Sequence, residues 1–470
     1  MKHLLAITFL LLTGKFANSQ VNWQTLPQGN TYWWEWVNTL YYDSIENNLI
    51  VAGNFIYLNN GDTIYHIAKW DGVKFLPLGK GLDNIGSPLY NTGTNILSIC
   101  PYQDKLYVGG GFARVGDLPF NNLAYCLATW DGMNWDSIAG YPKNEGVNNI
   151  RVYNDTLYIC GTMDSVADQQ ANGLIAYDGT SWHSMKLFNQ NPNPNENNVV
   201  IDIAFFNGDI YLSGVFYDST GHQHQMMRRQ NGVWEFMPED LDLHGGTDWS
   251  GTMMIYDNKL IVSGYFLQQW GNIDNNIMAW DGTQWHAMGG GTDAPIRNIF
   301  IHDDKLYAVG NFYTAGGVEV DKVAIWDGNE WCGLGGIFNN TVLSGAFYKD
   351  TLYVGGGFTT LSDSSAINIA RFAGGNDIDT CGALVSISQP TQNNFTFSFF
   401  PNPTTTQLTI TTSSNGKLTI TNSLSQTIQT LTINNAQQQI PTLTFPSGIY
   451  FLTFQTEKTI QTKKLLVQHE

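Results

Sequence analysis

Short apolar runs separated by turn residues recur along most of the chain. Each unit opens with a mixed apolar run, such as residues 299–301, and continues with a run of the type Leu-Tyr-Val-Gly-Gly. A run of the type Ile-Ala-x-Trp follows, and a last run carries another aromatic residue. Because turn residues stand between the runs, the pattern predicts four antiparallel strands in each unit.

Seven copies of this unit are marked by a shared glycine in the second run. The glycines lie at intervals of about fifty residues, which is typical of a propeller blade. They are Gly53, Gly110, Gly161, Gly214, Gly264, Gly310 and Gly356. One unit cannot bury both faces of its own sheet, whereas packed neighbours can. The sequence therefore predicts an all-β chain that contains a seven-bladed β-propeller.

Asp-Gly or Asn-Gly follows the third run in six units, as in Trp70-Asp71-Gly72 and Gln230-Asn231-Gly232. Such dipeptides predict two-residue hairpins in which both turn residues have positive φ. We expect the glycine of the second strand to allow close backbone approach. The late tryptophans are expected to cover the wide outer gap between blades.

The seventh unit lacks its last strand, and the start of the mature chain offers one. The unit ends near Gly374-Gly375 without a final tryptophan, whereas residues 21–26 contain Trp23 in the pattern of an isolated fourth strand. We expect residues 21–26 to pair with residues 369–372, because ring closure removes two exposed sheet edges.

The N-terminus reads as a secretory signal peptide. An apolar run at residues 4–12 follows Lys2, and Ala17 and Ser19 favour cleavage before Gln20. No later run is apolar enough to span a membrane. We expect residues 1–19 to be a signal peptide, 20–376 the propeller, 377–394 a linker and 395–470 a second domain.

The net charge of the chain limits the classes of partner that it is expected to bind. The chain has 22 Lys and Arg against 40 Asp and Glu, a formal net charge of −18. This balance argues against nucleic acid and against an anionic membrane surface as partners. The acidic residues are concentrated in the propeller region and the tail is nearly neutral, which indicates separate modules.

The repeats over about residues 21–376 resemble the kelch-like propellers of the galactose-oxidase central-domain type. The glycine-rich second strand and the late tryptophan match, while Trp-Asp-Gly stands where that family usually has Tyr-Asp. The resemblance implies a fold that hosts both binding and catalysis.

The tail is similar to the C-terminal sorting domain of the type IX secretion system over about residues 395–468. The matching residues are Pro401, Asn402, Pro403, Gly448, Tyr450, Lys463 and Lys464, and Ser425 stands where that family usually has glycine. The resemblance implies a small Ig-like β-sandwich, the type IX machinery as partner and a Bacteroidota-type source. It also implies passage through the periplasm to secretion or the outer cell surface. An ordinary Ig-like adhesion domain is the alternative.

Motifs for catalysis and for cofactors are weak. The sequence has no Gly-x-Ser-x-Gly, His-Glu-x-x-His or phosphate-binding loop. His222 and His224 lack an evident third metal ligand, and we expect no cofactor. Calcium held by Asp240, Asp242 and Asp248 is the alternative.

We expect a ligand face where the long connections between strands gather, because function on rigid scaffolds collects in such loops. Aromatic planes beside amides suit sugar rings, although these rings can also simply plug the channel mouth. The candidates are Tyr32, Trp33, Trp34, Trp36, Trp249 and Trp270, with Tyr90, Tyr217 and Tyr313 on the same face. The expected function is a non-enzymatic binding or adhesion propeller for an extracellular glycan or protein. An extracellular carbohydrate-active enzyme and a purely structural surface component are the alternatives.

Five cysteines leave at least one unpaired within the chain. Cys332 ends the sixth unit and Cys381 follows the last, so we expect a disulfide between them near the ring closure. Cys100, Cys126 and Cys160 lie in predicted strands and are expected to be buried thiols.

Overall fold

The computed structural model describes residues 23–26, 30–44, 46–59, 62–83, 94–116, 122–141, 146–193, 197–237, 250–362, 364–366, 368–373, 397–402, 404–412, 415–422, 427–434, 437–456 and 460–468. The chain divides into two compact units, Met1–Ala383 and Leu384–Glu470. Within these described ranges, no helix is both long and apolar enough to cross a membrane.

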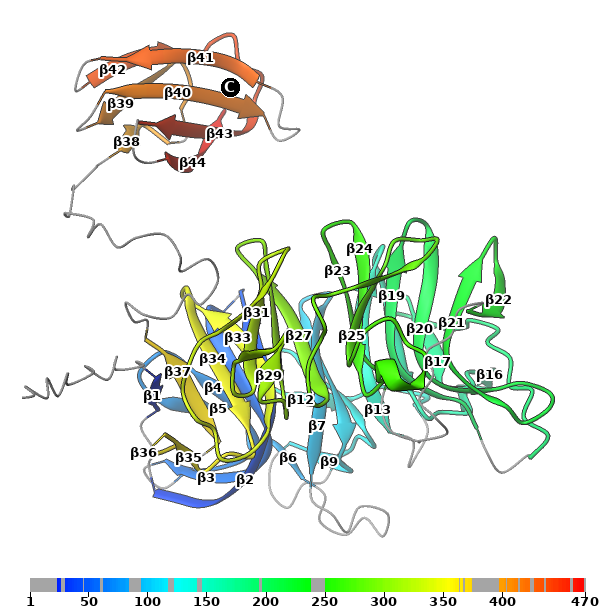
Figure 1. The fold of residues 1–470 in the computed structure, drawn as a ribbon. Helices are drawn as coiled ribbons and strands as arrows, with labels where there is room; N and C mark the ends of the chain where they lie inside the picture. Colours follow the sequence, from blue (N-terminus) through cyan, green and yellow to red (C-terminus); the bar gives the residue numbers. More distant parts are fainter. Residues whose placement is uncertain are drawn as a thin grey trace, which may run out of the picture. The chain divides into compact units, whose positions relative to one another are not determined.

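Seven four-stranded antiparallel sheets lie in the described part of the first unit (Figure 1). Six of these sheets are each formed from a single stretch of the chain. The first three are β2–β5 (Asn30–Asp43, Asn48–Asn59, Asp62–Trp70, Phe75–Pro77), β7, β8, β11 and β12 (Asn95–Tyr102, Lys105–Gly111, Leu127–Trp130, Trp135–Ser137), and β13, β14, β17 and β18 (Val147–Tyr153, Thr156–Gly161, Leu174–Tyr177, Trp182–Ser184). The next three are β19–β22 (Val199–Phe206, Asp209–Tyr217, Gln223–Gln230, Val233–Phe236), β23–β26 (Ser250–Tyr256, Lys259–Gly264, Ile277–Trp280, Trp285–Ala287), and β27, β28, β31 and β32 (Ile296–His302, Lys305–Gly310, Val323–Trp326, Trp331–Gly333). The seventh combines β33, β34 and β37 (Val342–Tyr348, Thr351–Gly356, Ile369–Phe372) with β1 (Trp23–Thr25).

The sheets form a closed ring. The first strand of each sheet contacts the first strand of the next, and β33 contacts β2 to complete the cycle. These seven first strands therefore surround a central channel, and we refer to each sheet as a blade, numbered one to seven from β2–β5 to the sheet of β33.

Shorter elements decorate the connections. They are the hairpins β15–β16 (Ser165–Val166, Gln169–Gln170), β29–β30 (Thr314–Ala315, Val318–Glu319) and β35–β36 (Thr360–Leu361, Ser364–Ser365), the small sheet β6–β9–β10 (Leu82–Asp83, Arg114–Val115, Asn122–Leu123) and the 3-10 turn η1 (Gln268–Trp270). Most of them lie between the second and third strands of a blade, at the end that the long loops were predicted to occupy.

The predicted closure is confirmed: β1 pairs antiparallel with β37, with Trp23 opposite Phe372 and Thr25 opposite Ala370. The Trp23 ring packs edge-on against Phe338 and Phe372, with centroids 5.2 and 5.1 Å apart. Its indole N–H donates to the Gly335 carbonyl at 2.9 Å. The first residues that the structure describes therefore complete the last blade.

The repeated glycine and phenylalanine hold one backbone junction. Lys322 precedes the third strand of the sixth blade in the left-handed region at φ 72°. Its N–H donates to the Phe312 carbonyl and its carbonyl accepts from the Gly310 N–H. A Cβ on Gly310 would lie 2.4 Å from the Pro295 carbonyl oxygen. This close approach explains why glycine recurs here, as the sequence predicted.

The recurring tryptophans tie five of the described blades to the one before, whereas the first blade carries Phe75 at this position. Paired rings at the turn between the third and fourth strands lie 4.6–5.3 Å apart in five blades. Indole N–H groups of the fourth strands donate to carbonyls of the preceding blade, as from Trp135 to Leu78 and from Trp331 to Met288. Trp23 makes the same bond, so the opening strand fills the role of a regular fourth strand.

The prediction of two-residue Asp-Gly hairpins is wrong for five blades. Trp70 pairs with Phe75, so four residues form the turn, and the Asp71 side chain accepts the N–H groups of Val73 and Lys74 at 2.8 and 2.9 Å. The turn is therefore stabilised by the Asp71 carboxylate, rather than by two residues with positive φ as in a two-residue hairpin. A two-residue turn occurs only at Asn231-Gly232 among these six described turns.

The second unit contains two sheets around one core. The sheets are β38–β39–β42 (Phe397–Phe400, Gln407–Thr412, Gln437–Pro441) and β41–β40–β43–β44 (Thr427–Ile433, Gly416–Asn422, Gly448–Gln455, Ile460–Val467). Buried residues from both sheets, among them Leu408 and Leu465, share a single cluster. The Asn402 side chain accepts the Leu466 N–H at 2.8 Å. The opening motif of the tail therefore binds its final strand.

Candidate ligand-binding site

The first strand of every blade carries an irregularity at an equivalent position. The register of β27 shifts between Ile296 and Asn298, and β7 shifts between Ile96 and Ser98. A bulge leaves one residue unpaired and redirects its side chain. The extra residues are Asn38, Leu97, Asn148, Ile201, Arg297 and Leu343, with Gly251 and Thr252 in the fifth blade. All of them line the channel.

The channel encloses a cavity of about 830 Å³. Seven blades contribute to its wall, which consists mainly of asparagine amides, hydroxyl groups and aliphatic side chains. Arg151 and Arg297 are the charged residues among the described lining, which holds no carboxylate. A cavity of this size falls within the range of small-molecule sites, roughly 300–1,000 Å³.

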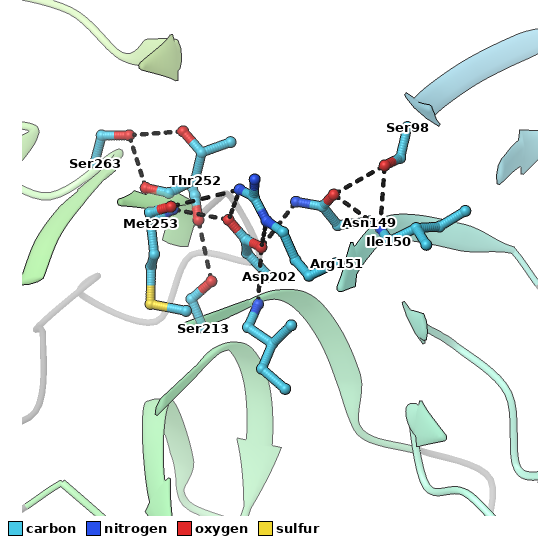
Figure 2. Close-up of polar contacts among 11 residues, drawn as sticks. Ser98, Asn149, Ile150, Arg151, Asp202, Ser213, Thr252, Met253 and Ser263 are labelled. Carbon is cyan, nitrogen blue, oxygen red and sulfur yellow. Dashed lines mark hydrogen bonds and ion pairs between the residues drawn. The ribbon is translucent and has the colours of Figure 1, made fainter. Parts of the chain in front are cut away.

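A chain of polar side chains links neighbouring blades next to the bulges (Figure 2). The Ser98 hydroxyl donates to the side-chain Oδ1 of Asn149 at 2.9 Å and accepts the Ile150 N–H at 3.0 Å. The Asn149 amide in turn donates to Asp202 at 2.8 Å. We call Ser98, Asn149 and Asp202 the inter-blade belt. The belt aligns three first strands, so it fixes the geometry of the channel wall.

Asp202 is the anchor of the belt and is fully buried. Arg151 grips it with two bonds, from Nε to Oδ1 at 3.1 Å and from Nη2 to Oδ2 at 2.9 Å. The N–H groups of Ile203 and Met253 also donate to this carboxylate, each at 2.8 Å. With five donors around it, Asp202 is a satisfied structural anion.

Arg151 spans three blades, because Nη2 also lies 3.4 Å from the Met253 carbonyl oxygen (Figure 2). The charge of Asp202 raises the pKa of Arg151, so the guanidinium stays protonated. Its side chain is 36 % exposed while that of Asp202 is 0 % exposed. The pair therefore presents a cation to the channel and keeps the anion behind the wall.

Nearby thiols are poor nucleophiles. Burial raises the pKa of Cys100 to about 11 and that of Cys160 well above its ordinary value. Cys126 and Cys160 are buried as predicted, whereas Cys100 is half-buried. Cys332 is buried and disulfide-bonded. Its expected partner, Cys381, lies outside the described residues, so this pairing stays a prediction.

The aromatic candidates that the structure describes come from several blades. Tyr32, Trp33 and Trp34 lie in the long β2 strand, where Trp33 pairs with Ile56 and Trp34 with Phe55. The Trp36 side chain, 37 % exposed, packs against Gly357 of the seventh blade.

The remaining long-loop candidates are spread over other blades. Trp270 lies in η1 beside Tyr265, with ring centroids 5.3 Å apart. Tyr217 lines the channel, and the exposed Tyr313 lies over the ammonium of Lys322. Trp249 and Tyr90 lie outside the described residues, so the ligand role of this face stays a prediction.

The described residues give no geometric support to the predicted metal sites. His224 stacks on Phe236 at 3.9 Å and lies 3.5 Å from Asp218. In the described part of the chain, no three His, Cys, Asp or Glu residues gather as a metal site. Asp240, Asp242 and Asp248 lie outside that part.

The inter-blade belt was missed in the sequence analysis. Its members occupy the same column of the repeat, one residue after the bulge, where Thr39, Asn298 and Ser344 also stand. Alignment of the seven first strands would have shown a polar column inside an apolar strand. The contacts between blades cannot be read from any single copy.

Comparison with known proteins identifies the tail. Residues 398–468 match the family described as the secretion system C-terminal sorting domain. This domain directs the chain to the outer cell surface or to secretion. A search of curated proteins finds no match.

Solved structures with similar folds include β-propellers. PorZ, a surface component of the type-IX secretion system of Porphyromonas gingivalis, has a TM-score of 0.37 at 11% identity and covers 90% of this chain and 69% of its own. The propeller domain of the trilobed protease from Pyrococcus furiosus has 0.42 at 12% identity, covering 73% and 96%. An exo-β-1,3-galactanase from Phanerochaete chrysosporium has 0.26 at 10% identity, covering 80% and 96%. TM-scores this low transfer no ligand or activity.

Proposed function

We propose that this chain is a secreted or surface-attached binding propeller of kelch-like type, with seven blades and an Ig-like sorting tail. The type IX secretion machinery exports it, and its ligand is an extracellular glycan or protein. The observation that carries the proposal is the central channel of about 830 Å³, walled by aliphatic side chains, amides and hydroxyl groups from a closed ring of strands. Such groups donate and accept hydrogen bonds, which suits them to hold a polar ligand.

Binding without catalysis is the version that the channel supports best. Glycoside hydrolysis requires a pair of carboxyl groups that flank the scissile bond. The carboxylate of Asp202 is bonded to the lining residue Arg151, and its oxygens are occupied by Arg151, Asn149 and backbone N–H groups. An acid held in this way stabilises the wall.

The test measures both the binding of glycans and their hydrolysis. The mature chain is labelled and applied to a glycan array, and each bound glycan is then incubated with the chain in solution. We expect retention on at least one glycan class with no release of reducing ends. Release of reducing ends would show the carbohydrate-active enzyme instead. Absence of any glycan ligand, together with failure to bind cells or extracellular proteins, would leave only a structural surface component.

A paired variant separates the two candidate faces. Trp33→Ala combined with Trp34→Ala changes the long-loop face and leaves the channel lining intact. Unchanged binding assigns the ligand to the channel, whereas loss of binding assigns it to the aromatic strand β2.

A further inference from the structure

We propose that the central channel binds an acidic sugar, a hexuronic acid unit or a short oligomer of such units. This inference deepens the proposed function, on which it rests. It combines three features of the wall: two arginines, one of them held by an ion pair, an amide without a described partner, and apolar surface.

Cations face the cavity from two blades of an acidic protein. Arg151 on β13 and Arg297 on β27 line the channel, and no carboxylate accompanies them among the described lining residues. In the described part of the chain, the hydrogen bonds of Arg151 use Nε and Nη2. Its Nη1 N–H groups are therefore left for a ligand, and a carboxylate is the group that a guanidinium binds best.

The ion pair behind the wall fixes the position of this cation. Asp202 is fully buried and holds Arg151 by two bonds. Pre-organisation of this kind removes part of the side-chain entropy that ligand binding would otherwise cost. An overall charge of −18 would repel an anion over most of the surface, whereas guanidinium N–H donors from two blades face the channel.

Amide groups supply the contacts that hydroxyl groups need. Asn298, beside Arg297, is half-buried in the channel wall and has no hydrogen-bond partner among the described residues. An amide both donates and accepts, which is what a sugar hydroxyl also does. Carboxylate recognition at Arg297 and hydroxyl recognition at Asn298 thus adjoin each other on one strand.

Apolar side chains complete the wall. Leu343 occupies the bulge of the neighbouring seventh blade, and Phe300 lines the cavity two residues after Asn298. The C–H faces of a sugar ring pack on such surfaces. A small carboxylate without a ring would use the arginines and leave these surfaces unused, so the wall favours the acidic sugar.

Calorimetric titration of the mature full chain with trigalacturonic acid tests the proposal. Galactotriose and acetate serve as the neutral sugar and the simple carboxylate. We expect trigalacturonic acid to bind at least tenfold more tightly than either. Arg297→Gln is expected to weaken it at least tenfold, and Arg297→Lys should weaken it less, because the ammonium keeps the charge but not the fork of N–H donors. Arg114→Gln, outside the channel lining, provides the matched control.

Folding of the variants is checked by melting temperature. If Arg297→Gln lowers it, Asn298→Ala serves instead, because that amide bonds to no described residue. Equal binding of galactotriose, binding that survives both substitutions, or no binding of trigalacturonic acid would overturn the acidic-sugar proposal. Glycan-array retention of a neutral glycan would then leave the proposed function standing, so the two failures are distinguishable.

Discussion

A left-handed residue precedes the third strand of most blades, and the side chain there differs from blade to blade. Asn276 and Asn368 turn their amides onto backbone carbonyls at 2.7 and 2.9 Å. Asparagine adopts this backbone region at low cost. His66, which lies inside the longer β4 strand of the first blade, takes the same left-handed conformation at φ 64°. Its Nδ1 is buried and has no hydrogen-bond partner among the described residues.

His66 makes the fold sensitive to mild acid. Burial lowers the pKa of His66 from 6.5 to about 4. Between pH 6.5 and pH 4, His66 is protonated in the unfolded chain and neutral in the folded protein. The stability that this residue contributes is therefore present above pH 6.5 and is lost as pH falls toward 4. The free energy of unfolding should drop by about 2 kcal/mol between pH 7.5 and pH 5 from this group.

His66→Asn should remove that part of the pH dependence, because it installs the residue used in the fifth and seventh blades. Denaturant unfolding at the two pH values measures it. Hydrogen bonds from His183 and His286 are the first cause of the lowered pKa values of Asp178 and Asp281. These carboxylates change protonation below the two pH values compared, so they do not affect the difference. His222→Asn, at an exposed position, is the control. An unchanged difference between the two pH values in His66→Asn would contradict the assignment.

At the scale of elements, the ring depends on one short strand from the start of the described chain. Pairing of β1 with β37 covers a sheet edge that would otherwise offer unpaired N–H and carbonyl groups. Arg371 reinforces the pairing by donating from Nε and Nη2 to the Gln24 side-chain oxygen at 3.1 and 2.8 Å.

Removal of this strand should open the ring. Deletion of residues 20–28 is expected to lower the melting temperature by many degrees, since it takes away the ladder and the Trp23 contacts together. Trp23→Ala should cost about 2 kcal/mol, less than a fully buried tryptophan. Trp23→Phe keeps an aromatic ring but loses the bond to Gly335 and part of the packing area, so it should cost about 1 kcal/mol, less than the alanine variant. A melting curve of the deletion variant that matches the wild type would refute closure by β1.

The disulfide of Cys332 gives a second prediction at this scale. If Cys381 is its partner, the bond closes a loop of roughly fifty residues, and its loss should cost up to about 4 kcal/mol in the chain-entropy account. Cys332→Ser and Cys381→Ser should then destabilise equally, while Cys100→Ser should not follow them. Peptide mapping without reductant checks the pairing directly, and a linkage of Cys332 to any other residue would exclude it.

The strands and turns that could be predicted from the sequence are those whose residues recur from unit to unit. The Gly53-type position recurs because two backbone segments approach closely there, and the late tryptophans recur because they bond to the preceding blade. The Asp71 turn was misjudged because an Asx turn and a two-residue hairpin share the dipeptide Asp-Gly. The partnership of Arg151 with Asp202 could not be predicted, because it joins different repeats and occurs in one place.

The whole molecule combines a ring, whose stability is shared between neighbouring blades, with a separate export module. The sorting domain has its own core and forms its own compact unit from residue 384 onward. Its matched region, residues 398–468, lies wholly inside that unit. Folding of the ring and export of the chain should therefore be separable functions.

Truncation after residue 383 tests this separation in a bacterium that carries a type IX system. We expect the truncated chain to remain in the periplasm, whereas the full chain reaches the cell surface or the medium. The purified truncated ring should keep its melting temperature and its ligand, because its core clusters contain no residue of the tail.

Within the tail, Lys463→Ala with Lys464→Ala should reduce export if the final strand is read by the machinery. Lys463 is exposed and pairs opposite Leu452, so its removal leaves the core intact. Lys417→Ala, an exposed lysine on β40, is the matched control. Fractionation followed by immunoblotting measures all four chains. Export of the truncated chain would show that the propeller carries its own export signal, and equal export of the two lysine variants would remove the final strand from recognition.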